Sequence, residues 1–127
     1  MPGTSVGPAV PEPVVSICIP SFNAERHIRK CIESVLQSDV ESIELIVADD
    51  ASTDGTWEIV LELVGDDPRA TVLRHPQNLG AAANWDEVLR LARGRYVKLL
   101  CSDDHLLPGG LAEIGRASCR ERVCWIV

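Results

Sequence analysis

The sequence predicts an α/β fold, a three-layer α/β/α sandwich built around a mainly parallel sheet. Short apolar runs rich in β-branched residues alternate with longer segments in which apolar residues recur at helical spacing, in the order β-α-β-α-β-α-β. This alternation indicates parallel strands joined by right-handed helical crossovers. The runs are apolar on both faces, as expected when helices cover both sides of a sheet.

The first predicted strand spans residues 14–19. It follows a leader, residues 1–13, where four prolines and two glycines predict disorder. After the strand, Asn23 is expected to cap a helix that has Glu25 in its first turn and ends near Ser38. The apolar stripe of this helix consists of Ile28, Cys31, Ile32, Val35 and Leu36.

Three more strands are predicted, at residues 43–48, 70–74 and 96–100, and the last should lie beside the first. Gly94 is placed to end the helix before that last strand. If later strands are missing, the outer edge of strand 96–100 is unpaired, which favours aggregation. Two more helices are predicted between these strands, and both tryptophans in their apolar stripes are expected in the core. The stripe of the first helix consists of Trp57, Val60, Leu61 and Val64, and that of the second of Ala81, Trp85, Val88, Leu89 and Ala92.

The composition limits the class of protein. The 127 residues suffice for one domain, and the net charge of −7, from 12 basic and 19 acidic residues, disfavours a nucleic-acid partner. No apolar run is long enough to span a bilayer, and the N-terminus lacks a signal pattern, so we expect a cytoplasmic protein. The five cysteines include no C-x-x-C pair and are expected to be reduced thiols rather than zinc ligands or disulfides.

The last segment, residues 115–127, does not continue the pattern. It carries three arginines and two cysteines with poor periodicity, and it resembles a translated sequencing-adapter tail. We therefore expect a folded domain at residues 14–114 followed by a non-native tail. The alternative is a short native amphipathic end.

Polar residues follow three of the predicted strands, at 20–23, 49–55 and 101–104. Because the carboxyl ends of parallel strands lie at one edge of the sheet, these loops should converge there and form a site. The adjacent carboxylates Asp103 and Asp104 are hard oxygen ligands, suited to Mg²⁺ or Mn²⁺ beside a phosphate. Taken alone, the pair could equally begin a solvated turn.

Four ordered motifs resemble family 2 glycosyltransferases with the GT-A fold, which is Rossmann-like. The likeness covers about residues 14–112, and four motifs in order are a more specific signal than any one of them. The second motif has the family's acidic loop after a strand, and the fourth occupies the place of its "DXD" motif. The motifs lie at residues 15–23, 44–56, 78–84 and 102–104.

The resemblance implies a role for each site residue. Pro20 and Phe22 stand where the family's first loop flanks the nucleotide base, and Asn23 ends the same motif. In the acidic loop, Asp49 precedes Asp50, which matches the acid that accepts a hydrogen bond from a uracil-type N–H. In the fourth motif, Asp103 matches the carboxylate near the ribose and metal, and Asp104 matches the acid that binds the divalent ion directly.

The resemblance also implies a function: metal-dependent, inverting transfer of a sugar from a nucleotide-diphosphate sugar, most often a UDP-sugar, to an unknown acceptor such as a polysaccharide, lipid or protein glycan. In the family, the acceptor-binding half and the catalytic base follow the metal motif. We therefore expect a truncated GT-A domain that holds the donor-binding half, is inactive alone, and is cytoplasmic or peripheral to the inner face of the membrane. Many relatives have an acid at the position of Cys101, so the metal site should be weaker here.

Two other functions remain open. One is a non-catalytic fragment that binds nucleotide and metal. The other is a phosphoacceptor switch domain, which the sequence disfavours because its acidic pair should follow the first strand. Among the weaker candidates, Asp54 is expected to cap the second helix, and His75 and His105 to be solvated loop residues. Arg74 and Lys98 are expected at the surface.

Overall fold

The computed structural model describes residues 15–38, 42–106 and 125–126. It confirms the predicted alternation of strands and helices. In the described residues, no helix is long and apolar enough to cross a membrane. The elements in chain order are β1 (Val15–Ser21), α1 (Ile28–Leu36), β2 (Ile43–Asp49), α2 (Thr56–Val64), β3 (Ala70–Arg74), α3 (Ala81–Leu91), β4 (Tyr96–Leu99) and β5 (Trp125–Ile126).

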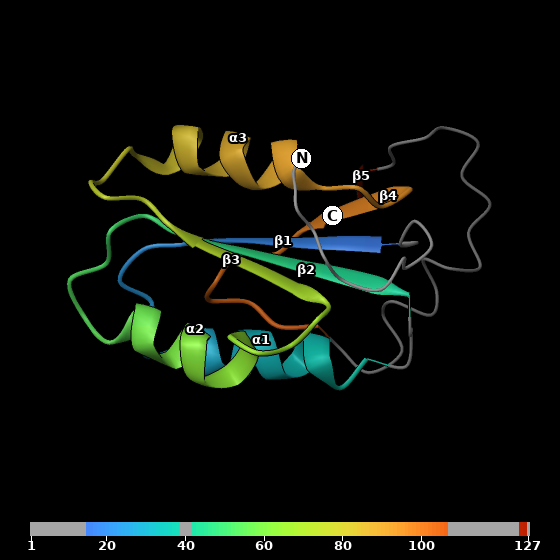
Figure 1. Cartoon of the computed structure of the whole chain (residues 1–127), viewed down its shortest axis with the longest axis horizontal. Helices are drawn as coiled ribbons and strands as arrows, with labels where there is room; N and C mark the ends of the chain where they lie inside the picture. The colour runs from blue at the N-terminus through green and yellow to red at the C-terminus, as the bar shows by residue number, and fades with distance from the viewer. Residues whose placement is uncertain (1–14, 39–41, 107–124, 127) are drawn as a thin grey trace.

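The sheet has the strand order β3-β2-β1-β4-β5, and every neighbouring pair is parallel. Helix α3 covers one face, and α1 and α2 cover the other, which gives the predicted three layers (Figure 1). The chain adds strands on one side of β1 as far as β3 and then returns to the other side with β4. This reversal makes the carboxyl ends of β1 and β4 the switch point where open α/β sheets bind ligands.

Alternate residues of β1 serve two separate cores. Ile17 and Ile19 pack in a cluster with residues of α1 and α2, while Cys18 packs with Val88 of α3 on the other face. All seven residues of β1 and all seven of β2 are buried. The apolar character of both strand faces is thus explained by the helices on each side.

The predicted cap of the first helix is wrong. Helix α1 begins at Ile28, and no side chain caps it. Asn23 instead has a φ of 48°, and its Oδ1 accepts a hydrogen bond from the Thr53 N–H at 2.8 Å. Glu25 Oε1 accepts one from the Gly55 N–H at 2.6 Å. Both side chains therefore join the loop after β1 to the loop before α2.

Three other sequence-based expectations are corrected. Leu61 and Trp85 were expected in the core, but they are exposed, since α2 and α3 bury narrower faces than the apolar stripes suggested. Gly94 does not end α3, which stops at Leu91. A Cβ at Gly94 would lie 2.7 Å from the backbone nitrogen of Ser16, so this glycine permits close approach to β1.

The outer edge of β4 is not wholly unpaired. Two residues of β5 pair with it in parallel, with Val97 opposite Trp125 and Lys98 opposite Ile126. The remainder of the expected tail and the expected leader lie outside the described residues. The non-native origin of residues 115–127 stays a prediction.

Candidate functional site

A pocket of about 310 Å³ lies at the carboxyl ends of β1, β2 and β4, where the sequence predicted a site. Its volume is at the lower end of the usual range for small-molecule sites. Asp50 is the sole charged side chain among its lining residues, so the pocket wall itself carries no cation. The lining residues are Pro20, Ser21, Phe22, Asp50, Asn78, Gly80, Ala81, Asn84, Trp85, Cys101 and Ser102.

Asp50 organises the wall between β2 and α3. Its side chain is buried, and Oδ1 accepts a hydrogen bond from the Leu79 N–H at 2.7 Å while Oδ2 accepts one from the Gly80 N–H at 3.0 Å. Its backbone carbonyl accepts a third from Asn78 Nδ2 at 3.1 Å. A carboxylate offers about four lone-pair positions, so Asp50 can hold this loop and still accept from a ligand.

Asp49 does not line the pocket. Its side chain is fully buried, and it accepts hydrogen bonds from the Ser52 hydroxyl at 2.6 Å and the Ser52 N–H at 3.0 Å. Arg74 Nε lies 3.3 Å from Asp49 Oδ2, and the Arg74 guanidinium stands over the Trp57 ring. Asp49 therefore holds the turn after β2 in place. Asn23 also has a structural role, because it joins two neighbouring loops. The nucleotide-binding role of both residues stays a prediction.

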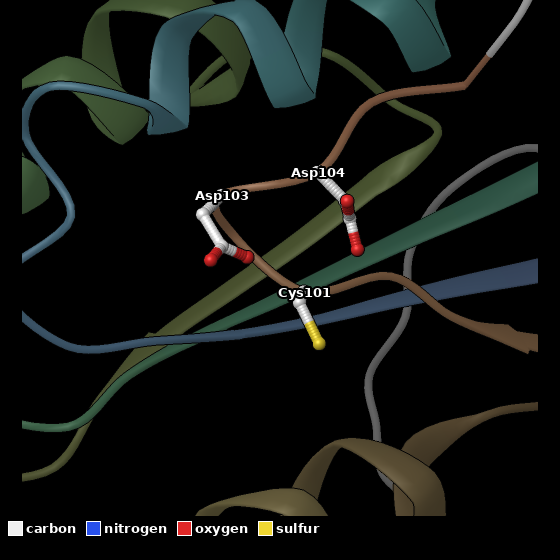
Figure 2. Close-up of side chains that lie close together, drawn as sticks. All are labelled: Cys101, Asp103 and Asp104. Atoms are coloured by element: carbon white, nitrogen blue, oxygen red, sulfur yellow. The ribbon is translucent and has the colours of Figure 1, made fainter.

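The predicted metal ligands lie on the loop after β4. One donor atom each from Cys101, Asp103 and Asp104 lie within 4.8 Å of one another (Figure 2). The Asp104 N–H donates to the Cys101 carbonyl at 2.9 Å, which closes the turn that brings them together. The two carboxylates are exposed, whereas Cys101 is half-buried and lines the pocket.

The donor set fits a hard divalent cation. Burial and then the charges of Asp103 and Asp104 raise the pKa of the Cys101 thiol, which favours its protonated form. Two exposed carboxylates with room for water and phosphate oxygens are the usual surroundings of Mg²⁺ or Mn²⁺. The three converging loops carry Phe22, Asp50 and Asp104. Phe22 and Asp50 line the pocket, whereas Asp104 does not line it but follows the lining residues Cys101 and Ser102 in the chain.

Two buried polar residues beside the pocket, Asn84 and His75, differ from the sequence-based expectations. Asn84 lines the pocket but is buried, with Nδ2 donating to the Ala48 carbonyl at 3.1 Å. His75 was expected to be solvated, but it is buried, and its Nε2 lies 2.9 Å from Asn84 Oδ1. Because Oδ1 can only accept, His75 Nε2 donates. The signal was available, since Asn84 lies four residues before Val88 and so shares its buried helix face.

Asp54 is not the N-cap of α2, which is Gly55, but it bonds to the first residue of that helix and does not line the pocket. Its Oδ1 accepts hydrogen bonds from the N–H and hydroxyl of Thr56, the first residue of the helix. Its Oδ2 accepts one from the Glu25 N–H at 3.3 Å. The Thr56 hydroxyl in turn accepts from the Ala24 N–H at 2.8 Å, so the loops after β1 and β2 are bonded together beside the pocket.

The sequence of this chain matches the model of a known family. The sequence model of Glycosyl transferase family 2 matches residues 16–123. The chain belongs to glycosyl transferase family 2. The match confirms the resemblance carried by the four motifs, and it continues into residues 115–123 of the segment that we expected to be foreign.

Relatives in family 2 share this part of the chain. Chondroitin synthase of Pasteurella multocida is 38% identical over 96 residues, which are 76% of this chain and 10% of that protein. The putative teichuronic acid biosynthesis glycosyltransferase TuaG of Bacillus subtilis is 41% identical over 93 residues, 73% of this chain and 37% of TuaG.

Solved family 2-like structures confirm the GT-A fold. TarS of S. aureus in complex with UDP-GlcNAc has a TM-score of 0.74 and 28% identity, covering 80% of this chain and 30% of that chain. The mannosyltransferase PcManGT of Pyrobaculum calidifontis, in complex with GDP-Man and Mn²⁺, has a TM-score of 0.71 and 25% identity. The match covers 88% of this chain and 34% of that chain. The chain therefore spans well under half the length of each of these four proteins.

Proposed function

We propose that this chain binds the nucleotide part of a nucleotide-diphosphate sugar together with Mn²⁺ or Mg²⁺, and that it serves an enzyme that transfers the sugar to an acceptor. The observation that carries the proposal is the pocket at the switch point, lined by Phe22 and Asp50 and continued by the carboxylates of Asp103 and Asp104. Family 2 membership and the TarS complex with UDP-GlcNAc support a UDP-sugar as the donor.

The pocket suits the base of the nucleotide. Phe22 offers an exposed aromatic surface, and Pro20 lies in the same wall. The Asp50 carboxylate is held in place by two backbone N–H groups, which leaves it oriented to accept a hydrogen bond from a base N–H. A uracil ring presents both a flat face and such an N–H, so these three residues would bind and orient it.

The loop after β4 suits the diphosphate through a cation. No lysine or arginine lines the pocket, so the residues there do not neutralise a diphosphate by themselves. Asp103 and Asp104 would hold the divalent ion, with Asp104 as the direct ligand and Asp103 also near the ribose. When bound, such an ion supplies a Lewis acid that stabilises charge on the departing diphosphate. The PcManGT complex with Mn²⁺ supports this part of the proposal.

Calorimetry tests the proposal. UDP should bind the chain in the presence of Mn²⁺, and affinity should fall at least about tenfold when EDTA replaces the metal or when Asp104→Asn removes a ligand. Asp66→Asn is the matched control, because Asp66 is an exposed acid beyond the far end of α2 and makes the same charge change. Equal affinities for wild type, Asp104→Asn and the EDTA sample would refute the metal-dependent site.

Three further points belong to the same proposal. Inversion at the anomeric carbon rests on family membership, and NMR of the product formed by the active enzyme would test it. A cytoplasmic location is supported by the free, buried thiols of Cys18 and Cys31. The acceptor and the catalytic base are assigned to none of the described residues.

A further inference from the structure

We propose that Trp85 is a stacking platform for the nucleobase, and so a further binding residue of the site. This inference rests on the proposed function. Its starting observation is that Trp85 lines the pocket while 40% of the residue stays exposed, although the sequence places it in an apolar helical stripe. A large aromatic side chain left half in water at a pocket is available to a ligand.

The position of Trp85 is set by its neighbour. Asn84 is fixed from two directions, because its Oδ1 accepts from His75 Nε2 and its Nδ2 donates to the Ala48 carbonyl. With Val88, it is a buried residue of α3 and fixes the rotation of the helix about its axis. Trp85 lies about 100° further around the helix than Asn84, so it is turned away from the sheet and onto the rim of the pocket.

Exposed apolar side chains gather at this pocket. Of the five large hydrophobic residues exposed in the described part of the chain, Phe22 and Trp85 line it, and Leu79 lies between two lining residues, Asn78 and Gly80. Phe22 comes from the loop after β1 and Trp85 from α3, so the aromatic surfaces belong to different walls. A flat ligand between these walls would cover apolar surface that water now contacts.

The chemistry favours the base over the rest of the donor. The diphosphate requires a cation, and the candidate cation ligands are Asp103 and Asp104, which are not lining residues. The base has flat π faces and polar edges, which match a pocket lined by the aromatic rings of Phe22 and Trp85 and by the polar side chains of Asp50 and Asn78. Stacking depends little on the identity of the base, so Trp85 adds affinity, and the hydrogen bonds of Asp50 supply selectivity.

The test uses the full chain with Mn²⁺ and, separately, UDP and GDP, neither of which contains a transferred sugar. Calorimetry compares wild type with Trp85→Ala, Trp85→Phe and the control Trp57→Phe. Trp57 is partly buried on α2 and outside the pocket. For the nucleotide that wild type binds more tightly, we expect Trp85→Ala to weaken binding roughly 5- to 150-fold, Trp85→Phe to retain most of the affinity, and the control to be unchanged.

Tryptophan fluorescence gives a second readout. The nucleotide should quench emission of wild type and of Trp57→Phe, and the quenching should be lost in Trp85→Phe, which keeps a stacking ring and the fold. Unchanged nucleotide affinity in a folded Trp85→Ala, as judged by circular dichroism, would overturn the stacking role and leave the proposed function intact. The same holds if a parallel titration shows that the variant loses affinity for UDP-GlcNAc but not for UDP, since Trp85 would then contact the sugar. A wild-type chain that binds neither nucleotide would overturn both proposals.

Discussion

The carboxylate of Asp50 holds the backbone of Gly80, with Oδ2 accepting a hydrogen bond from the Gly80 N–H at 3.0 Å. Gly80 has a φ of 96°, in the left-handed region that favours glycine, and it immediately precedes α3. Oδ1 binds the Leu79 N–H in the same way. One buried acid at the end of β2 therefore fixes the approach to the helix that carries Asn84 and Trp85.

We predict that Asp50→Asn destabilises this connection. The amide offers one acceptor oxygen and turns its NH₂ toward a backbone N–H, so one of the two N–H groups held by the buried Asp50 side chain loses its partner. The free energy of unfolding should fall by about 1–3 kcal/mol, measured by urea denaturation. Asp86→Asn, an exposed change on α3, is the control and should have almost no effect. Equal stabilities of the two variants would contradict the structural role of Asp50.

Gly94→Ala should destabilise the packing of the α3–β4 connection against β1. The new Cβ would lie 2.7 Å from the Ser16 nitrogen and 2.9 Å from the Val15 carbonyl carbon, and backbone atoms cannot move aside cheaply. Overpacking of this kind costs about 1–3 kcal/mol, which thermal denaturation would detect. Gly55→Ala is the comparison, because its Cβ would meet only the end of the Glu25 side chain. A smaller loss for Gly94→Ala than for Gly55→Ala would refute this reading.

Glu44 and Arg93 should contribute unequally to stability, although they form one ion pair at 2.9 Å. The Glu44 side chain is 7% exposed and also accepts from the Ser16 hydroxyl and the Arg93 N–H, whereas the Arg93 side chain is 64% exposed. Glu44→Ala should cost about 1–3 kcal/mol, because buried donors lose their acceptor. Arg93→Ala should cost less than about 1 kcal/mol. Urea denaturation of both variants measures the difference, and equal losses would contradict it.

Stability should fall above pH 9 because of the Cys18 thiol. Burial, and then the charge of Glu44, raise the pKa of Cys18 from 9.0 to about 12. Between these values the unfolded chain releases the proton and the folded chain keeps it, so the thiol contribution is complete below pH 9 and is lost as pH rises toward 12. Between pH 9 and pH 12, the free energy of unfolding should fall by about 1.4 kcal/mol per pH unit because of this one thiol.

The measurement compares wild type with Cys18→Ala by urea denaturation under reducing conditions. The difference in unfolding free energy between the two proteins should be constant below pH 8 and should shrink between pH 9 and pH 11. A difference that stays constant up to pH 11 would show that the thiol ionises equally in both states.

The sequence by itself determined the sheet and the location of the site. Apolar runs such as 14–19 and 43–48 are hydrophobic on both faces, which suits a helix-covered parallel strand, and parallel order brings their carboxyl ends to one edge. That rule predicted that the loops carrying Phe22, Asp50 and Asp104 converge at one edge of the sheet, and the placement of β4 beside β1 was also predicted. These features depend on local pattern and on the handedness of crossovers, both of which can be read from one sequence.

Only the tertiary structure decided what individual polar and small residues do. Asn23 and Thr53 are 30 positions apart, and Gly94 and Ser16 are 78 apart, so no periodicity within one element reports their contacts. His75 is buried for the same reason, since its partner Asn84 lies on α3 and is also held by the Ala48 carbonyl of β2. Helical spacing gives the angle between side chains, but the direction of the core is fixed by what packs against the helix.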